Sequence, residues 1–456
     1  MSVAIGLDLG SETVRVAALV EDRPVPVSAF PAVIATDGDR VRVGRAALAL
    51  ADAPRTVEGA PAERLAWLIR AAVHAVEEAH GGVLGAVIAV SPDLGVVERR
   101  ALRDAAAIAQ VPAVRLVSSP VATALSLPAA PDGRWLVCEA GAGAFTASVV
   151  DRALGAIDRL TTASEPSLGG RALDQLIAEQ LARAIDPTAT TADPVLVTAA
   201  AALKEHIGNA AAAEAALSGV LAGADERLRG LRPPRRDELE LWMAPRVRRV
   251  DEVCARALTA AGVAASDLSE VVLAGGGARL ALLARRLGQV LVRPPRVPAD
   301  AGFATALGAA RMARLFVAEP SALVVDVVRH GLSLACGGEP VPLVASGAVL
   351  PTRESRAIAT RDDNEVALEI ELWEQAAPPR VLGRWRVGEL PEAPAGDAVA
   401  LCNITVDADG LPRLSASELV SGAALALTPI AVPDADTGLD VERIAARRAL
   451  VAEWRP

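Results

Sequence analysis

The chain is poor in aromatic side chains and has no excess of basic ones. Its 456 residues include no tyrosine and four phenylalanines, and aromatic residues make up 2% of the total. Proteins that bind single-stranded nucleic acid usually stack bases on aromatic side chains, which this sequence can hardly supply. The net charge is −10 and the isoelectric point is near 5.2. Nucleic-acid phosphates and anionic membranes attract basic surfaces, so we expect neither as a partner.

Clustered metal ligands and long apolar runs are also missing. The four histidines lie at no metal-ligand spacing from cysteines or carboxylates, and we predict no structural metal site. We expect all four cysteines to be buried and reduced; they are Cys138, Cys254, Cys336 and Cys402. No uncharged apolar run reaches about 18 residues, and the start MSVAIGLDLG lacks the basic segment of a signal peptide. We therefore expect a cytoplasmic protein.

Hydrophobic residues make up 52% of the chain, and nearly all of them are aliphatic because aromatic residues make up only 2%. A chain of this length is expected to form two or three domains. Periodicity predicts the following elements. Strands are predicted over 3–9, 13–20, 85–90, 113–117, 135–138 and 271–274, and helices over 61–79, 98–109, 171–184, 195–207, 237–262, 280–290 and 303–317.

Two hairpins of similar design lie within this series. Residues 3–20 predict a strand, a tight turn and an alternating strand, with an acidic residue before the turn glycine. Residues 135–150 repeat this order around a turn at 139–143, as an internal near-repeat. A third apolar strand, 271–274, runs into the glycines 275–277. Glycine-bearing elements therefore recur in one predicted α/β domain.

The period changes to two near the C-terminal end. Apolar and polar residues alternate over 366–373, 381–387 and 402–406, and Asp409 with Gly410 marks a turn. This pattern predicts an all-β domain. The predicted bounds are 1–318 for the α/β domain, 319–327 for an apolar connector, 328–430 for the β domain and 431–456 for a tail with one amphipathic helix from about Asp440 to Trp454.

The acidic residues Asp8 and Glu139, each followed by a glycine turn, indicate phosphate chemistry. Successive backbone N–H groups in a tight turn form a concave site for anions, and glycine lets the backbone approach a phosphate. A neighbouring carboxylate can hold Mg²⁺ or orient a water. A single turn of this kind is weak evidence, whereas three glycine elements in this order are far more specific.

These segments resemble the 70-kDa heat-shock chaperone family over about residues 3–420. The matching segments are IGLDLGSETV (5–14), AVIAVSPDLGVVERRALRDAAAIAQVPAVRLVSSPVATAL (86–125), VCEAGAGAFTASVV (137–150), SLGGRALDQLI (167–177), SDLSEVVLAGGGARL (266–280), LPTRESRAIATRDDNEVALEIELWE (350–374) and LCNITVDADGLPRLSASEL (401–419). The resemblance implies an actin-like (ribonuclease H-like) α/β nucleotide-binding domain with two lobes, followed by a β-sandwich that binds peptides.

The resemblance also implies a role for each matching residue. Asp8 would hold Mg²⁺ through water, and Asp8 and Glu139 would act in catalysis. The residues that would bind ATP or ADP are Gly10, Ser11, Glu12, Thr13, Gly141, Ala142, Gly143, Gly170, Lys204, Gly275, Gly276, Gly277, Arg279 and Asp300.

In the β domain, the resemblance implies a groove for an extended polypeptide. The implied positions are Cys336, Ile358, Arg361, Leu368 and Ile370, and Arg361 replaces a residue that is usually small. Alternation alone leaves open whether Leu368 and Ile370 are only core residues. The family's long helical lid follows its sandwich, but here we find only the tail, so we expect fast peptide release and modest affinity.

Several of the family's hydrolytic groups are replaced. The second-loop aspartate is Glu139, the threonine after the third glycine is Ala144, and Asn-Glu-Pro in the crossover is Ser118-Ser119-Pro120. The stretch 52–65 contains no lysine. We therefore expect slow ATP hydrolysis. Arg55 or Arg64 could partly substitute for the lysine, but we favour the alternative that both are solvated surface arginines.

Three functions remain open. The favoured one is an atypical chaperone of protein folding and the stress response, which binds ATP and extended polypeptide and works with a co-chaperone or nucleotide-exchange factor. The second is a pseudo-ATPase that serves as a nucleotide-gated scaffold for a fixed protein partner. The third is a sugar or acetate kinase of the actin-like superfamily, which does not explain the β domain.

Overall fold

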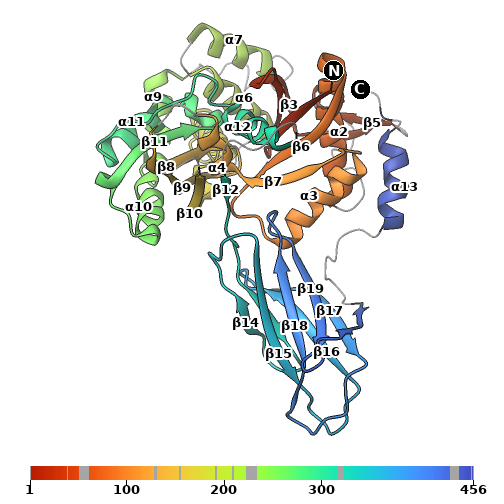
Figure 1. Ribbon diagram of the computed structural model, residues 1–456. Coiled ribbons are helices and arrows are strands. Elements are labelled where there is room, and N and C mark those ends of the chain that lie inside the picture. Colours follow the sequence, from red (N-terminus) through yellow and green to blue (C-terminus); the bar gives the residue numbers. More distant parts are fainter. Residues whose placement is uncertain are drawn as a thin grey trace. The chain divides into compact units, whose positions relative to one another are not determined.

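The structure, a computed structural model, describes residues 2–37, 40–50, 61–127, 131–153, 156–189, 193–207, 210–221, 234–316, 323–431, 441–452 and 454. The chain forms two compact units, which Figure 1 draws with colours that follow the sequence. Unit 1 comprises Met1–Leu9, Thr13–Ser119 and Ala309–Pro456, and unit 2 comprises Gly10–Glu12 and Pro120–Gly308. We call the part of unit 1 before Pro120 the first lobe, and residues 326–430 the sandwich.

The first lobe is built on a five-stranded mixed sheet. Its strands, in spatial order, are β3 (Arg23–Pro31), β2 (Thr13–Val20), β1 (Ser2–Leu9), β6 (Gly82–Val90) and β7 (Val114–Ser118). β1 runs antiparallel to β2 and parallel to β6. The helices α2 (Pro61–His80) and α3 (Val96–Ile108) bury their apolar faces in the same core as these strands. The strands and helices predicted here are confirmed.

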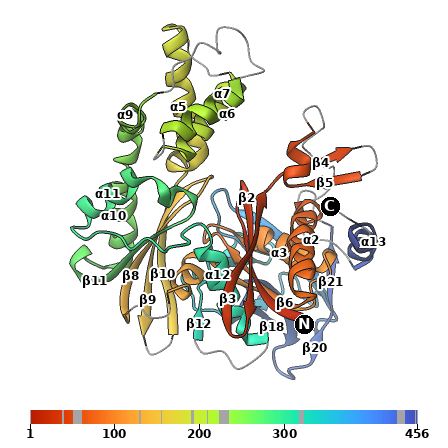
Figure 2. The same cartoon turned by 90° about the horizontal axis from the view of Figure 1, so that it is seen from above.

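Four elements of the first lobe and the packing of the tail were not predicted. They are the strand β3 described above and the short elements β4 (Ile34–Asp37), β5 (Arg40–Val43) and α1 (Arg45–Leu48). The predicted tail helix is confirmed as α13 (Val441–Ala452), and it packs beside α2 and α3 (Figures 1 and 2). Val451 and Trp454 are buried in the first-lobe core, and Trp454 Nε1 donates to the carbonyl of Val41 at 2.8 Å.

Unit 2 has its own sheet and a separate core. Four strands lie in the order β11 (Leu268–Ala274), β8 (Gly133–Ala140), β9 (Phe145–Ala153) and β10 (Ala156–Glu165). The helices are α4 (Ser119–Leu125), which begins at the last residue of the first lobe, α5 (Gly170–Ile185), α6 (Pro194–Glu205), α7 (Ala210–Leu221), α9 (Arg236–Val247), α10 (Val250–Ala261), α11 (Ala281–Val290) and the part of α12 (Ala304–Met312) up to Gly308.

Two predicted helices differ from the observed ones. The single helix predicted over 237–262 is broken into α9 and α10 at Arg248 and Arg249. Pro245 lies in the last turn of α9, where it lacks a backbone N–H and crowds the preceding turn, so the helix ends shortly after it. The helix predicted over 303–317 is α12 followed by a 3₁₀ turn, Ala313–Phe316.

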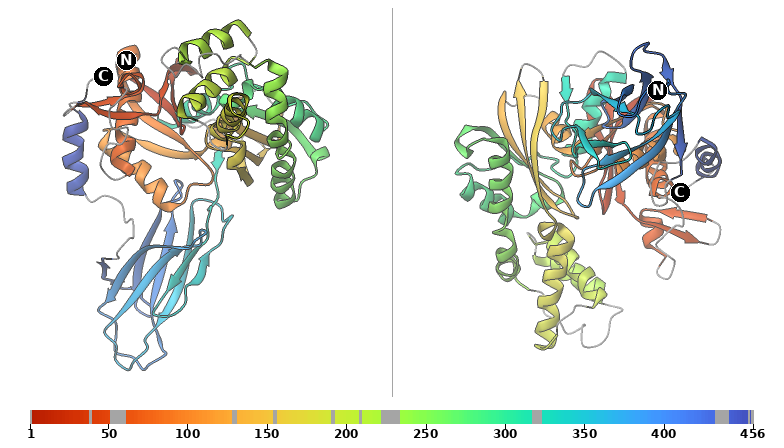
Figure 3. Two further views of the ribbon diagram at one scale, coloured as in Figure 1. Left: turned by 180° about the vertical axis from the view of Figure 1, so that it is seen from behind. Right: turned by 90° about the horizontal axis from the view of Figure 1, so that it is seen from below.

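The sandwich consists of two antiparallel sheets, seen from two sides in Figure 3. One sheet has the order β14 (Val341–Val344), β13 (Leu332–Ala335), β16 (Ala367–Glu374), β17 (Arg380–Gly388) and β21 (Leu427–Ile430). The other has the order β15 (Thr352–Ala359), β18 (Ala398–Val406), β19 (Pro412–Glu418) and β20 (Ala424–Leu425). Their inner faces share two apolar clusters.

The alternation predicted for β17 is interrupted. The register with β16 pairs Leu372 with Gly383 and Trp373 with Val381, so Leu382 is an extra residue. Leu382 is buried in place of Val381, because the bulge shifts the residues before Gly383 by one face, whereas Gly383 and Val387 remain on the predicted face. The connector includes the short strand β12 (Leu323–Val325), whereas residues 317–322 lie outside the described residues. The predicted domain bounds remain predictions. None of the described helices is long and apolar enough to cross a membrane.

Candidate functional site

The first hairpin places Asp8 at the end of β1, opposite Arg15 on β2. The two side chains lie 3.8 Å apart, and the Asp8 side chain is 23% exposed. Burial raises the pKa of Asp8 from 3.8 to about 6, and the positive charge of Arg15 offsets only part of this effect. The charged form of the Asp8 carboxylate is therefore costly, and a nearby cation would stabilise it.

The second hairpin places Glu139 at the end of β8. The predicted turn at 139–143 lies slightly later in the structure, because β8 continues to Ala140 and the Gly141 N–H donates to the Ala144 carbonyl at 3.0 Å. Glu139 Oε1 lies 3.0 Å from Thr123 Oγ1 and 3.4 Å from Thr305 Oγ1. Sequence reasoning predicted Glu139 but not these two threonines, which lie on other elements.

The two predicted glycine turns face each other inside unit 2. A Cβ at Gly143 would lie 3.4 Å from Ser11 Oγ, and Glu12 lies 3.6 Å from Arg171. A Cβ at Gly169 would lie 2.5 Å from the backbone of Gly143, so no side chain fits there. The structure therefore brings together the turn at 10–12, the turn at 141–143 and the glycine pair before α5.

The predicted Lys204 holds the start of α5. Its ammonium group lies 2.6 Å from Asp174 and donates to the Gly170 carbonyl at 2.8 Å. Burial raises the pKa of Asp174, and Lys204 partly offsets this rise. The backbone N–H of Gly170 donates to the Gly141 carbonyl at 2.9 Å, which connects this pair to the second turn. Asp174 lies within 167–177, one of the segments that resemble the family. Its position four residues after Gly170 was the sequence signal available for this contact.

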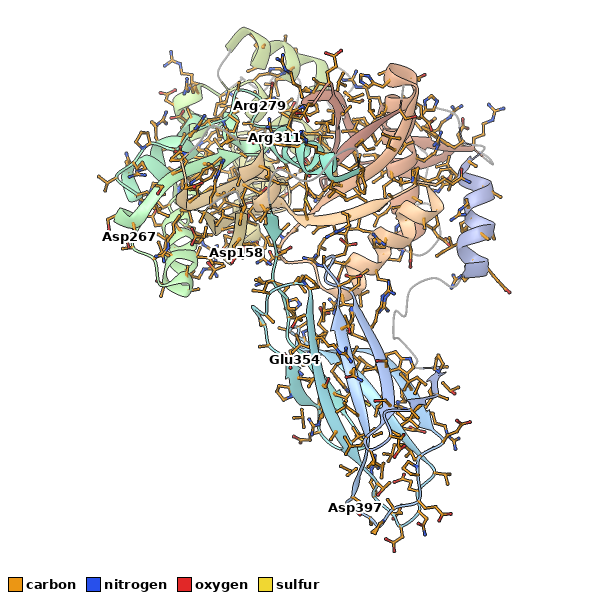
Figure 4. All side chains as sticks on the ribbon, viewed as in Figure 1. Asp158, Asp267, Arg279, Arg311, Glu354 and Asp397 are labelled. Atoms are coloured by element: carbon orange, nitrogen blue, oxygen red, sulfur yellow. The ribbon has the colours of Figure 1, made fainter. Side chains whose placement is uncertain are left out.

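The triple glycine also reaches the second hairpin. Gly275 has a φ of +88°, and a Cβ there would lie 2.6 Å from the Ala140 carbonyl oxygen. A Cβ at Gly277 would lie 2.7 Å from the Ala140 side chain, so both positions require glycine. The other three predicted residues of this segment, Gly276, Arg279 and Asp300, are exposed, and Figure 4 labels Arg279.

These residues fit a nucleotide with its cation. Among the described residues, no group of three or more His, Cys, Asp and Glu side chains could enclose a metal ion. Mg²⁺ commonly keeps several waters and binds to one or two carboxylates and substrate phosphates, so a single carboxylate, such as Asp8 in unit 1 or Glu139 in unit 2, is compatible with it. Turns in which backbone approaches backbone without side chains leave N–H groups for phosphate oxygens.

The five residues predicted to line a groove in the sandwich differ in their burial. Ile358, Leu368 and Ile370 are at most 3% exposed and belong to one apolar cluster. Cys336 is half-buried beside this cluster, and Arg361 is exposed. A Cβ at Gly337 would lie 1.0 Å from an Arg361 guanidinium nitrogen, so the guanidinium fills the space in front of that glycine. In this conformation three of the five residues are core.

Inside unit 1, the sandwich contacts the first lobe through a charged turn that sequence reasoning missed. Asp409, between β18 and β19, accepts hydrogen bonds from Arg103 at 2.9 Å and Arg115 at 3.0 Å. It also accepts the backbone N–H of Leu116 at 2.8 Å and is 4% exposed. Asp409 was predicted as a turn residue only, because nothing local in the sequence indicates a partner about 300 residues away.

A second carboxylate makes a similar contact. Glu374, at the end of β16, is 1% exposed and accepts the backbone N–H of Val96 at 2.9 Å, at the first turn of α3. The N-terminus of a helix favours a negative charge. A Cβ at Gly95 would lie 2.6 Å from Glu374 Oε1, so glycine is needed there. The predicted alternation ended at residue 373. Its continuation by one residue places the charged Glu374 on the same face as Leu372, which was the available signal.

Comparisons with known proteins agree with the motifs. Residues 55–448 match the family model described as Hsp70 protein. The chain is similar to the chaperone protein HscA of Cronobacter sakazakii (strain ATCC BAA-894), with 29% identity over 376 residues, 79% of this chain and 59% of that protein. For HscA of Escherichia coli O7:K1 (strain IAI39 / ExPEC) the identity is 29% over 364 residues, 77% of this chain and 58% of that protein. The chain thus spans somewhat less than three fifths of the length of these relatives.

These findings confirm the family resemblance. The mixed α/β sheets and the β-sandwich are the parts of the predicted fold that the structure itself contains. The roles of the individual site residues remain predictions. Residues 51–60, where the missing lysine and Arg55 were discussed, lie outside the described residues. Arg64 lies near the start of α2 and is exposed.

Proposed function

Because the chain belongs to the Hsp70 family, we propose that it is a cytoplasmic, ATP-binding chaperone that hydrolyses ATP slowly and binds extended or unfolded polypeptide. The observation that carries this proposal is the contact between the two glycine turns in unit 2, where Ser11 faces Gly143 and Gly169 leaves no room for a side chain. Such an arrangement can bind phosphate oxygens through backbone N–H groups, whereas a purely structural hairpin does not need it.

Each part of the nucleotide has candidate residues. The phosphates would be held by backbone N–H groups of 10–13 and 142–143, since the Gly141 N–H donates to the Ala144 carbonyl. The adenosine would be held by the segment 275–279 with Lys204 and Asp300. Mg²⁺, when bound to the phosphates, neutralises their charge during phosphoryl transfer. Asp8 and Glu139 would orient the water around this cation.

Slow hydrolysis follows from the side chains at the site. Ala144 has no hydroxyl where the family has threonine, and Ser119 has no carboxylate where the family has glutamate. Each lost group that positions water or stabilises charge typically lowers the rate by about 10²–10³-fold. We expect turnover below about 1 s⁻¹, the low end of ordinary enzymes.

Polypeptide binding would use the sandwich, and coupling would use its contact with the first lobe. Asp409 and Glu374 accept hydrogen bonds from backbone N–H groups of the first lobe at 2.8 and 2.9 Å. Truncating either side chain would leave buried donors without partners. A nucleotide that shifts the first lobe could therefore shift the sandwich, and a co-chaperone or exchange factor could act on the same equilibrium.

One observation favours a second function, a pseudo-ATPase that acts as a nucleotide-gated scaffold for a fixed protein partner. Ile358, Leu368 and Ile370 are buried, and Arg361 fills the space at Gly337. A groove closed in this way would not accept many apolar peptides.

Peptide binding tests the two functions against each other. We would measure the affinity of a fluorescent apolar heptapeptide and of unfolded model proteins, with ATP and with ADP. The chaperone function predicts binding to several sequences, weakened by ATP, and tighter binding in Arg361→Ala because the groove opens. Arg413→Ala, at an exposed arginine on β19, is the matched control and should bind like the wild type. Binding to none of these polypeptides, in the wild type and in Arg361→Ala alike, would favour the scaffold.

A further inference from the structure

The Glu139 carboxylate is held by hydroxyl groups from two helices. Thr123, on α4, and Thr305, on α12, lie 3.0 and 3.4 Å from Glu139 Oε1 and 3.0 Å from each other. Thr123 is 0% and Thr305 is 6% exposed. All three residues belong to unit 2, so the cluster does not depend on how the units are arranged.

A close helix crossing brings the two threonines together. Gly308 of α12 packs against Ala122 of α4, and a Cβ at Gly308 would lie 1.6 Å from the Ala122 carbonyl oxygen. Thr123 is the neighbour of Ala122, and Thr305 lies one turn before Gly308 on the same helix. Any larger residue at position 308 would separate the helices, and the hydroxyl groups could then no longer reach each other.

The hydroxyl protons fix the order of donors and acceptors in the cluster. Each threonine hydroxyl has one proton to donate. The shortest set of contacts has Thr305 donating to Thr123 and Thr123 donating to Glu139, which leaves the carboxylate as the final acceptor. Hydrogen bonds to a carboxylate favour its charged form and fix its rotamer. A glutamate has one more rotatable bond than the family's aspartate, and immobilising it costs more side-chain entropy.

We propose that Thr123 and Thr305 are positioning residues, which hold the Glu139 carboxylate in one orientation so that it can orient the water around nucleotide-bound Mg²⁺. This inference rests on the proposed ATP binding. It explains how a longer carboxylate can serve where the family has a shorter one. Thr123 and Thr305 touch neither nucleotide nor cation in this scheme and act only through Glu139.

The test compares two double variants of the full chain. Thr123→Val with Thr305→Val removes both hydroxyl groups at nearly constant volume, whereas Thr123→Ser with Thr305→Ser retains them. We would measure ATP affinity by calorimetric titration, once with Mg²⁺ and once with EDTA. In the valine pair, we expect the gain in ATP affinity from Mg²⁺ to be about tenfold smaller than in the wild type, which is the effect of one hydrogen bond to a charged group. The ATP affinity in EDTA should be unchanged. The serine pair should keep the gain. In a Glu139→Gln background the valine pair should have no further effect.

Each result decides the inference. An unchanged Mg²⁺-dependent gain in the valine pair would overturn it, and so would an equal loss with Mg²⁺ and with EDTA, since that is the signature of a structural role. If the valine pair does not fold, Thr305→Val alone removes the more distant hydroxyl and should lose a smaller part of the gain; no loss there would also overturn the inference. Failure of the wild type to bind ATP would defeat the proposed function first, and that result is seen before any variant is made.

Discussion

The two acidic hairpins share one sequence pattern but accommodate their carboxylates in different ways. Asp8 pairs with Arg15 at 3.8 Å, and burial raises its pKa to about 6. Glu139 accepts a hydrogen bond from the Thr123 hydroxyl group, which in turn accepts one from Thr305 on a second helix. A buried charge without enough partners destabilises the protein, whereas a buried charge with hydrogen bonds is stable. The first carboxylate therefore gains most from an incoming cation, and the second is already fixed before any cation arrives.

The largest expected effect comes from Gly308→Ala, which should break the cluster around Glu139. The new Cβ would lie 1.6 Å from the Ala122 carbonyl oxygen, so α4 and α12 must separate. We expect a loss of about 3 kcal/mol or more in the free energy of unfolding, measured by urea denaturation.

Gly219→Ala is the matched control for this change. Gly219 lies in α7, and no atom lies within 4 Å of its added Cβ. Alanine there should stabilise the protein by about 0.5–1 kcal/mol, because glycine is a poor helix former. Equal effects of the two substitutions would show that the helix crossing does not depend on Gly308.

Neutralising each carboxylate should change stability in opposite directions. At pH 8 and without nucleotide, Asp8→Asn should stabilise the protein by about 2 kcal/mol. A pKa raised from 3.8 to about 6 corresponds to about 3 kcal/mol, and the partial exposure of Asp8 reduces this value. Glu139→Gln should destabilise it by about 1–2 kcal/mol, because the hydroxyl donors lose a charged acceptor. Thermal or urea unfolding gives both values, and effects of the same sign would remove the contrast between the hairpins.

The contrast should also depend on pH. The folded-state pKa of Asp8 is raised from 3.8 to about 6, so the native state binds this proton more tightly than the unfolded chain. The resulting stability is fully present below pH 3.8 and is lost as the pH rises through about 6. The difference in unfolding free energy between the wild type and Asp8→Asn should therefore grow across this window. A difference that stays constant from pH 4 to pH 7, expected for a group without a shift, would contradict the assignment.

The smallest expected effect concerns Arg15. Arg15→Gln removes the charge 3.8 Å from Asp8 and should cost about 1 kcal/mol at pH 8 and less at pH 4, where Asp8 is protonated. Arg42→Gln is a control, because its ion pair with Asp37 spans 3.9 Å and the aspartate side chain is 55% exposed. Exposed pairs contribute about 0–1 kcal/mol, and we expect the control to lie near zero at both pH values. If Arg15→Gln behaved like the control, Arg15 would not be a partner of Asp8.

Local patterns predicted the hairpins, because strand alternation and turn glycines act over a few residues. The cluster around Glu139 could not be predicted in this way, since Thr305 is far from Glu139 in the sequence and one threonine on a helix has no local signature. The same limit applied to Asp409 and to the packing of Trp454 on the first lobe. Alternation placed Leu368 on one face of its strand, but a period of two cannot tell a core face from a groove.

Calorimetric titration with ATP, with and without Mg²⁺, tests the central claim that the two glycine turns form a nucleotide site. We predict saturable binding of one nucleotide per chain and a gain in affinity from Mg²⁺ that is smaller in Asp8→Asn. A rise in the thermal midpoint should accompany binding, because the nucleotide stabilises only the native state. The absence of saturation and of any thermal shift at millimolar ATP with Mg²⁺ would contradict the claim.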